Sequence, residues 1–115
     1  MATYEDIEID QGADIAIELH MVNLDGSKKD LSNHTVSARM RKSYSATNYT
    51  AFTTVVSSPT TEGISTLLLT NTETDNLDPG RYVYDVEISY QDSDENDIIE
   101  RVLEGRITVK PSVTY

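Results

Sequence analysis

The segment 77–90 constrains the fold more than any other part of the sequence. Pro79 fixes its own φ and Gly80 can adopt a positive φ, so this pair predicts the two central positions of a type II turn. From Tyr82 onwards, alternate residues are apolar on one side and mostly polar on the other. This period of two is typical of a half-buried β-strand, which we expect to begin at about Arg81.

The same segment also predicts a particular type of packing. Leu77-x-Pro79-Gly80-x-Tyr82 has the spacing of a tyrosine corner, in which a ring at the start of an inner strand packs inward. The hydroxyl of that tyrosine bonds to the backbone a few residues upstream. Pro79, Gly80 and Tyr82 are therefore expected to be structural residues of a Greek-key β-sandwich.

Six further segments have strand character, which brings the expected number of strands to seven; these segments are 4–10, 13–21, 34–42, 49–57, 64–70 and 98–110. Segment 49–57 has apolar residues on both faces, so its register stays open. A phase change near Val102 and Leu103 predicts a bulge in the last strand, and Pro111 should end that strand. The sequence thus predicts an all-β, seven-stranded antiparallel sandwich of the immunoglobulin-like, Greek-key type.

One short helical turn is expected near 71–77, where Asn71 or Thr70 could act as the N-cap and Glu73 lies near the positive end. It would carry the chain from one sheet to the other. Alternation also predicts the core, whose expected members are Ile15, Ile17, Leu19, Val36, Ala38, Met40, Leu67, Leu69, Tyr82, Tyr84, Val86, Ile88, Ile107 and Val109. We expect Leu31 to anchor the loop before the third strand.

Length and composition limit the remaining possibilities. A chain of 115 residues with 37% hydrophobic content is expected to form one domain, 1–115. It has no cysteine, and therefore neither disulfides nor thiolate sites. No charged region followed by an apolar run opens the sequence, so we expect no secretion signal and no membrane span. The formal charge of −11 argues against nucleic-acid and membrane binding.

Catalytic and metal sites are not indicated. Asp92-x-Asp94-x-Asn96 resembles the start of a calcium loop, but the positions that need glycine and a bidentate glutamate hold Asp97 and Leu103. We interpret this segment as a solvated hairpin loop. The sequence contains no nucleophile turn of the Gly-x-Ser-x-Gly type, so we predict that the chain is not an enzyme and uses no metal or cofactor.

The two histidines, His20 and His34, have no partner at metal-ligand spacing, and we expect both at the surface. Tyr44 and Tyr49 flank a polar loop and are candidate contacts for a sugar or a protein. We favour core or mixed burial over such contacts, with Tyr49 entering the core along the fourth strand, because tyrosine suits either environment.

Arg39 and Arg41 point outward from the third strand in the expected pattern. Either they form an anion site, or they pair with Asp85 and Glu87 on the outward face of the neighbouring strand. Cross-strand pairing is the simpler interpretation, and it would mainly fix the register.

Several pieces of the sequence, taken in order, resemble a known group of proteins. These pieces are Ile9-Asp10-Gln11-Gly12-Ala13-Asp14, Asp25-Gly26 with Asp30-Leu31, Val36 to Arg41, Gly63 with Leu67 to Thr70, Leu77 to Val86, and Leu103-Glu104-Gly105 to Val113-Thr114. Their order is similar to that of small immunoglobulin-like proteins of tailed phages, in particular the amino-terminal module of phage baseplate upper proteins. Those proteins continue into a receptor-binding or adaptor portion, which the 115 residues do not include.

The resemblance implies a non-enzymatic structural or accessory module of the virion, in the tail, baseplate or head. Its partners would be other virion proteins, and it would be assembled in the host cytoplasm. A carbohydrate- or receptor-binding module that uses Tyr44 and Tyr49 is the alternative. The first and last strands are expected to be sheet edges, and the acids of segment 5–10 should discourage self-association. We therefore expect a monomer or weak oligomer when the chain is isolated.

Overall fold

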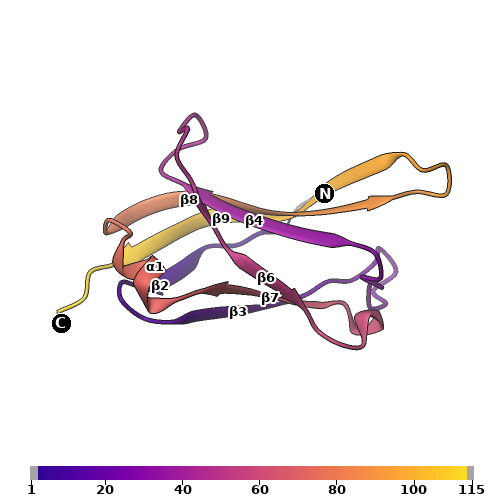
Figure 1. The fold of residues 1–115 in the computed structure, drawn as a ribbon, viewed down its shortest axis with the longest axis horizontal. Helices are drawn as coiled ribbons and strands as arrows, with labels where there is room; N and C mark the ends of the chain where they lie inside the picture. The colour runs from indigo at the N-terminus through magenta and orange to yellow at the C-terminus, as the bar shows by residue number, and fades with distance from the viewer. Residues whose placement is uncertain (1–2, 114–115) are drawn as a thin grey trace.

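The structure is a computed structural model that describes residues 3–113, which form a sandwich of two β-sheets with one short α-helix (Figure 1). The larger sheet contains β1 (Thr3–Tyr4), β2 (Ile7–Asp10), β4 (Thr35–Arg41), β5 (Thr50–Ala51), β8 (Gly80–Gln91) and β9 (Asp97–Lys110). The smaller sheet contains β3 (Ile15–His20), β6 (Thr53–Val56) and β7 (Ile64–Leu69). The expected all-β sandwich with a short helix is confirmed at this level.

The strand order is β1-β9-β8-β4-β5 in the larger sheet, with β2 also on β9, and β3-β7-β6 in the smaller one. β1 and β2 run parallel to β9, so the expectation of a wholly antiparallel sandwich was wrong. The last strand is not an edge either, because β9 pairs with β8 on one side and with β1 and β2 on the other. The chain starts at the border of the larger sheet and then crosses to β3 in the other layer. β2 and β9 are therefore not joined by a hairpin, and their pairing can be parallel.

Strands β8 and β9 form a long hairpin that extends beyond the sandwich at the right of Figure 1. Their register shifts where Val86 lies opposite Leu103 and Glu87 opposite Arg101. Val102 is thus the extra residue of a bulge, at the place where the alternation of the sequence changes phase. β9 ends at Lys110, directly before Pro111, as expected.

The segment 49–57 is not one strand, contrary to the prediction. β5 pairs with β4 in the larger sheet, whereas β6 pairs with β7 in the smaller sheet. Between them the buried Phe52 donates its backbone N–H to the carbonyl of Ala38 at 3.0 Å. Because the chain changes sheets at Phe52, the inward side of the segment changes too, which explains the apolar residues on both faces.

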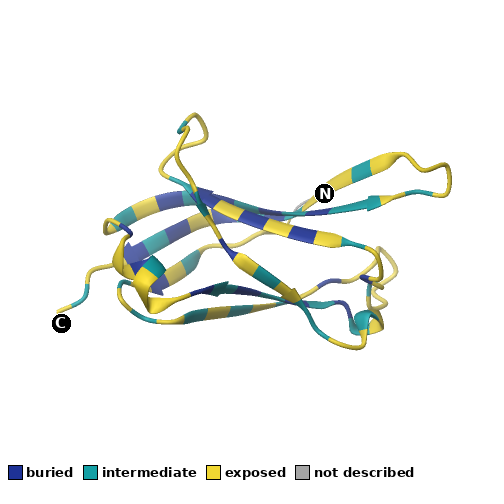
Figure 2. Ribbon diagram, in the orientation of Figure 1, coloured by how far each residue is buried: buried dark blue, intermediate teal, exposed yellow. Residues whose placement is uncertain are grey.

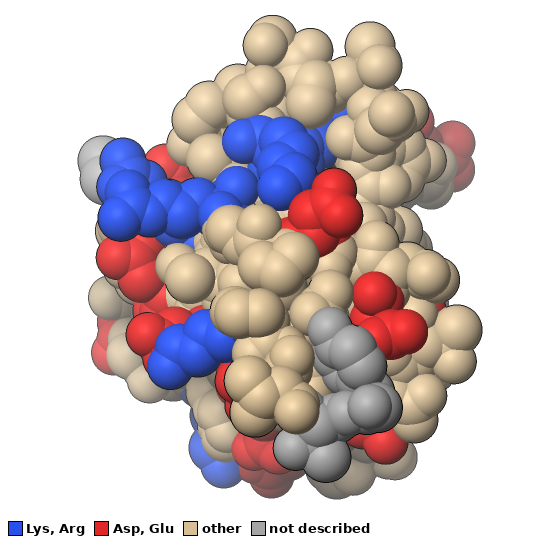
Figure 3. Space-filling view, turned by 90° about the vertical axis from the view of Figure 1, so that its left-hand side faces the viewer, with Lys and Arg blue, Asp and Glu red and all other residues tan. Residues whose placement is uncertain are grey.

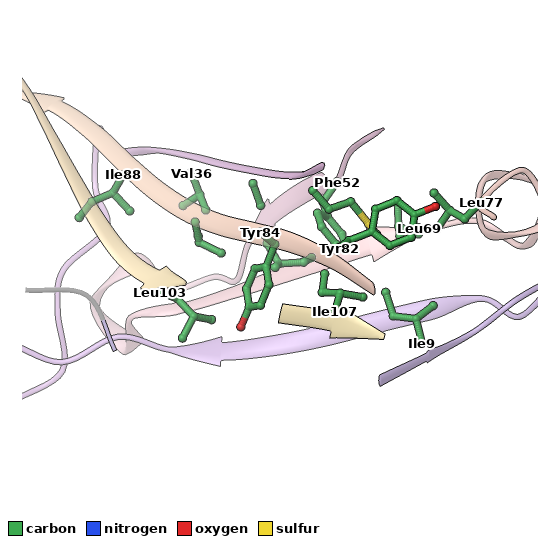
Figure 4. Packing of buried hydrophobic residues seen from close by; sticks show 14 of the residues in the cluster. Ile9, Val36, Phe52, Leu69, Leu77, Tyr82, Tyr84, Ile88, Leu103 and Ile107 are labelled. Atoms are coloured by element: carbon green, nitrogen blue, oxygen red, sulfur yellow. The ribbon is translucent and has the colours of Figure 1, made fainter. Parts of the chain in front are cut away.

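The core lies between the two sheets, and buried residues alternate with exposed ones along β4, β8 and β9 (Figure 2). Eleven of the expected core residues are buried, and Figure 4 shows part of this cluster. Ile15, Ile17 and Leu19 are only half-buried because β3 is an edge strand. Five buried apolar residues were not among the expected core members: Ile9, Met21, Phe52, Leu77 and Leu103.

The tyrosine-corner segment closes one end of the sandwich. Gly80 has a φ of +133°, and the Tyr82 hydroxyl donates to the carbonyl of Asp78 at 2.9 Å, as a tyrosine corner requires. Helix α1 (Asn71–Asp75) precedes this segment and begins with a capping box. Thr70 is the N-cap: its hydroxyl accepts from the backbone N–H of Glu73, and its own backbone N–H donates to the Glu73 carboxylate.

The amino-terminal segment is fixed to the larger sheet by close backbone contacts. The Tyr84 hydroxyl donates to the carbonyl of Glu5 at 2.6 Å, and the Glu5 N–H donates to the carbonyl of Glu104 at 2.8 Å. Gly105 lies directly against Glu5, where a Cβ atom would be 2.0 Å from the Glu5 carbonyl oxygen. A glycine is therefore required at this crossing.

Candidate ligand-binding face

All five arginines of the chain project from the outer face of the larger sheet. Arg39 and Arg41 are on β4, Arg81 is at the start of β8, and Arg101 and Arg106 are on β9. Arg39, Arg41, Arg81 and Arg106 lie next to buried residues along their strands and so point away from the core, whereas the bulge at Val102 brings Arg101 opposite the outward-facing Glu87. We call this surface the arginine face; its acidic members are Asp85, Glu87 and Glu104, together with Asp97 near the hairpin tip and Glu8 and Asp10 on the adjoining β2.

The loop 42–49 rises above this surface between β4 and β5 (Figure 1). The side chain of Tyr44 is 80% exposed and that of Tyr49 is 48% exposed. Tyr49 therefore does not enter the core, and both candidate residues are open to solvent. The loop is polar and lacks the apolar alternation that would pull it onto either sheet, so these two rings remain at the surface.

The two tyrosines are placed by β4. Tyr49 directly precedes β5, whose register pairs Met40 with Thr50, so its ring lies on the same outer side as the two arginines of β4. The guanidinium carbon of Arg39 is 4.2 Å from the centroid of the Tyr49 ring, and that of Arg41 is 5.0 Å away. These distances are within the range of cation–π contacts.

The arginines of β4 have different roles. Arg41 is half-buried and donates from Nη1 to the carbonyl of Ala46 at 2.7 Å, which holds the loop in place. Arg39 is exposed and has no ion pair among residues 3–113. Arg39 is thus oriented by Tyr49 while its outer N–H groups stay available.

A shallow groove of about 540 Å³ crosses the arginine face. Tyr44 borders it, and its polar lining combines Arg39, Arg41 and Arg101 with Ser37, Asp85 and Glu87. The groove therefore offers guanidinium donors and carboxylate acceptors side by side, next to an exposed aromatic ring. Such a combination can bind a polar ligand but holds no arrangement of nucleophile and base.

The expected pairing of Arg39 and Arg41 with Asp85 and Glu87 was only half right. Arg39 does lie opposite Asp85 in the register. The carboxylate of Asp85, however, contacts Arg101, with an Nε–Oδ2 distance of 3.3 Å, and Arg101 also reaches Glu104 at 3.5 Å. Arg39 instead stacks on Tyr49.

The other candidate residues lie apart from this face. His20 is exposed and hydrogen-bonds to Glu18, whereas His34 is half-buried and stacks on Tyr90, with ring centroids 4.4 Å apart. The carboxylate of Asp92 accepts hydrogen bonds from the backbone N–H groups of Asn96 and Asp94. These bonds lower the pKa of Asp92, and they show that its role is to shape the hairpin loop.

Across residues 3–113, no group of three or more His, Asp or Glu side chains has the arrangement to hold a metal ion. The only α-helix in this range, α1, is far too short and polar to span a membrane.

Comparisons with known proteins give little further guidance. No protein-family model matches the chain, and no curated protein matches it. Among solved structures, the chain is similar to AggA, the major subunit of aggregative adherence fimbriae type I from Escherichia coli. The two are 9% identical, the match covers 91% of this chain and 89% of AggA, and the TM-score is 0.47. A likeness at this level carries no argument about function.

Proposed function

We propose that this chain is a non-enzymatic binding module that contacts a carbohydrate or a receptor through the arginine face. The observation that carries this proposal is the exposure of Tyr44 and Tyr49 beside a groove lined by polar side chains. Exposed tyrosines present a flat apolar ring with a polar tip, which suits ligands that have both kinds of surface.

The test is binding of the Tyr44→Ala and Tyr49→Ala variants to an array of glycans and to candidate host cells. Both variants should lose binding of any ligand that the unchanged chain retains. Val55→Ala is the control, because Val55 is 48% exposed, like Tyr49, but lies on β6 in the smaller sheet. Equal loss in the control, or full binding by both loop variants, would contradict the proposal.

We also propose that the sandwich is of the immunoglobulin-like, Greek-key type. Three features support this assignment: the separation of β3, β6 and β7 from β4, β8 and β9, the parallel pairing of β2 with β9, and the hydrogen bond between Tyr82 and Asp78.

A second candidate function is the phage virion module implied by the sequence resemblance, located in the virion and bound to other virion proteins. An open sheet edge supports it. β3 is the outer strand of the smaller sheet, and beside it a groove of about 1070 Å³ runs towards β9. Leu19, Met21 and Val102 contribute apolar lining, and Leu24 stands fully exposed at the rim. Such an edge can accept an extended segment of a neighbouring protein.

This second function predicts a location that can be observed. Antibodies against the chain should label intact phage particles at one defined place in electron micrographs, and particles without label would contradict it. Leu24→Asp should reduce incorporation into particles, because the aspartate would place a charge at the apolar rim of the groove. Val113→Asp is the control, since Val113 is equally exposed at the opposite end of the chain.

A further inference from the structure

We propose that the ligand of the arginine face is an acidic polysaccharide that carries carboxylate groups; this inference rests on the proposed carbohydrate-binding function. The first support is the distribution of charge. The outward side of the larger sheet is formally neutral, because its six basic residues are balanced by six acidic ones, so the net charge of −11 lies on the rest of the chain. All five arginines gather on this one surface, which therefore repels anions less than the remainder of the protein does.

This separation of charge is also visible at the end of the molecule where β8 begins. Figure 3 shows Lys and Arg side chains gathered on the upper part of that end, towards the larger sheet, with Asp and Glu mainly below them. Lys42 adds to the positive side, since its Nζ atom lies 4.4 Å from the centroid of the Tyr82 ring. The positive region thus continues from the groove towards this end.

The second support is the availability of the arginines. Arg39, Arg81 and Arg106 have no ion pair among residues 3–113, whereas Arg101 is already shared by two carboxylates. A guanidinium presents a planar fork of N–H donors that matches a carboxylate with two parallel hydrogen bonds. Stacking of Arg39 on Tyr49 fixes the plane of its fork and lowers the entropy lost on binding.

The third support is the presence of acceptors in the same groove. Asp85 and Glu87 line it together with the arginines. These carboxylates would repel any anionic ligand, and a polyacidic peptide has no hydroxyl groups to offset that repulsion. They would accept hydrogen bonds from hydroxyl groups, however, and an acidic sugar offers hydroxyls and a carboxylate on the same ring. Tyr44 at the border of the groove adds a flat surface for the apolar face of such a ring.

The arginines also extend in one direction, which favours a polymer over a single sugar. Arg106 lies opposite Val83, and Arg81 lies two residues before Val83 on β8, about 6.6 Å along the strand. These two guanidinium groups continue the positive surface from Arg39 towards the start of β8. A chain of acidic sugars lying across β4, β8 and β9 would meet several of them in turn.

The experiment compares three immobilised polymers with the full chain. Polygalacturonate carries a carboxylate on every sugar, its fully methyl-esterified form has the same backbone without charge, and polyglutamate has the charge without sugar. We expect binding to polygalacturonate, at least about tenfold weaker binding to the other two, and loss of binding in about 0.5 M NaCl. Equal binding to polyglutamate would overturn the inference in favour of an acidic protein partner.

Variants connect the result to the arginine face. Arg39→Gln should weaken binding to polygalacturonate at least about tenfold, and Arg39→Lys should restore only part of it because lysine lacks the fork. Lys28→Gln also removes one positive charge, but outside the arginine face, where Lys28 pairs with Glu62. This variant should leave binding to polygalacturonate unchanged.

The outcomes separate the inference from the function on which it rests. Equal binding to the methyl ester would overturn the acidic ligand while leaving carbohydrate binding intact. Binding to none of the three polymers would also overturn the inference, and the glycan array with Tyr44→Ala would then decide the proposed function. An unchanged Arg39→Gln variant would show that the arginine face is not the site. Because Arg39 is exposed, its substitution should not disturb the fold. Urea denaturation of each variant checks that the fold is retained.

Discussion

Replacing Gly105 by alanine is the most direct test of how the amino-terminal segment is attached. The new Cβ atom would lie 2.0 Å from the carbonyl oxygen of Glu5 and 2.8 Å from its carbonyl carbon. Both are backbone atoms, so no side chain can rotate to relieve the contact. Segment 3–6 must move away from β9, and the hydrogen bond from the Tyr84 hydroxyl to Glu5 is lost with it.

The size of the effect follows from these two losses. Forcing an extra methyl group into a packed contact costs about 1–3 kcal/mol. Loss of one hydrogen bond adds about 0.5–1.5 kcal/mol. We therefore expect Gly105→Ala to lower the free energy of unfolding by about 2–4 kcal/mol. Strands β1 and β2 should lose protection against amide hydrogen exchange before the rest of the larger sheet does.

Urea denaturation followed by circular dichroism measures this change. Gly26→Ala is the control, because Gly26 also has a positive φ, +87°, but nothing lies within 4 Å of the added Cβ. It should cost only about 1–2 kcal/mol, the penalty of the left-handed conformation. The reasoning is refuted if Gly105→Ala is no less stable than Gly26→Ala. A double variant with Tyr84→Phe should lose less than the sum of the two single changes, because both remove the same hydrogen bond.

Three further predictions concern the core. Tyr82→Phe should cost about 0.5–1.5 kcal/mol by removing the hydrogen bond to Asp78, and an unchanged urea midpoint would contradict it. Leu69→Ala should cost about 2–5 kcal/mol, because Leu69 is only 2% exposed; a small shift in the urea midpoint would show that the site collapses around the deletion. Burial raises the pKa of Tyr84 above its ordinary value of 10.0, so the folded state keeps a proton that the unfolded state loses. Stability should therefore be full below about pH 10 and decrease above it, and Tyr84→Phe should show a smaller decrease in denaturation measured across that range.

Alternation and turn chemistry were sufficient to predict most of the fold. β4, β7, β8 and β9 each keep one face towards the core, so a period of two reveals both the strand and its inward side. The phase change at Val102 located the bulge for the same reason. Pro79 and Gly80 marked the start of β8 because their backbone preferences are local and do not depend on the partner strand.

The errors arose where the tertiary arrangement decides. The segment 49–57 gives no local sign that the chain changes sheets at Phe52, since each half is a plausible strand by itself. Parallel pairing of β2 with β9 joins residues about 100 positions apart, which no short-range pattern records. The half-burial of β3 follows from its place at an edge, and strand order is a property of the whole sandwich.

The candidate site was predicted in part. Tyr44, Tyr49 and Arg39 were recognised separately, but their association depends on the short pairing of β5 with β4. One signal was available in the sequence: Arg39, Arg41, Arg81 and Arg106 alternate with inward-facing residues and therefore face outward. Once β4, β8 and β9 are placed side by side, that alternation brings these four arginines to one surface, and the bulge at Val102 adds Arg101.

The two grooves share one residue, and this shared residue makes the two candidate functions experimentally separable. Arg101 lines both the groove on the arginine face and the groove beside β3. It also holds Asp85 at 3.3 Å and Glu104 at 3.5 Å, so its removal frees two carboxylates. Arg101→Gln should therefore weaken binding of an acidic polysaccharide and also disturb docking at the β3 edge. Arg39→Gln should affect only the first and Leu24→Asp only the second, because each of these residues lines or borders a single groove. Suppose that Arg101→Gln weakens only polysaccharide binding, like Arg39→Gln, or only docking at the β3 edge, like Leu24→Asp. The groove that is unaffected then does not depend on Arg101, and the two sites are independent.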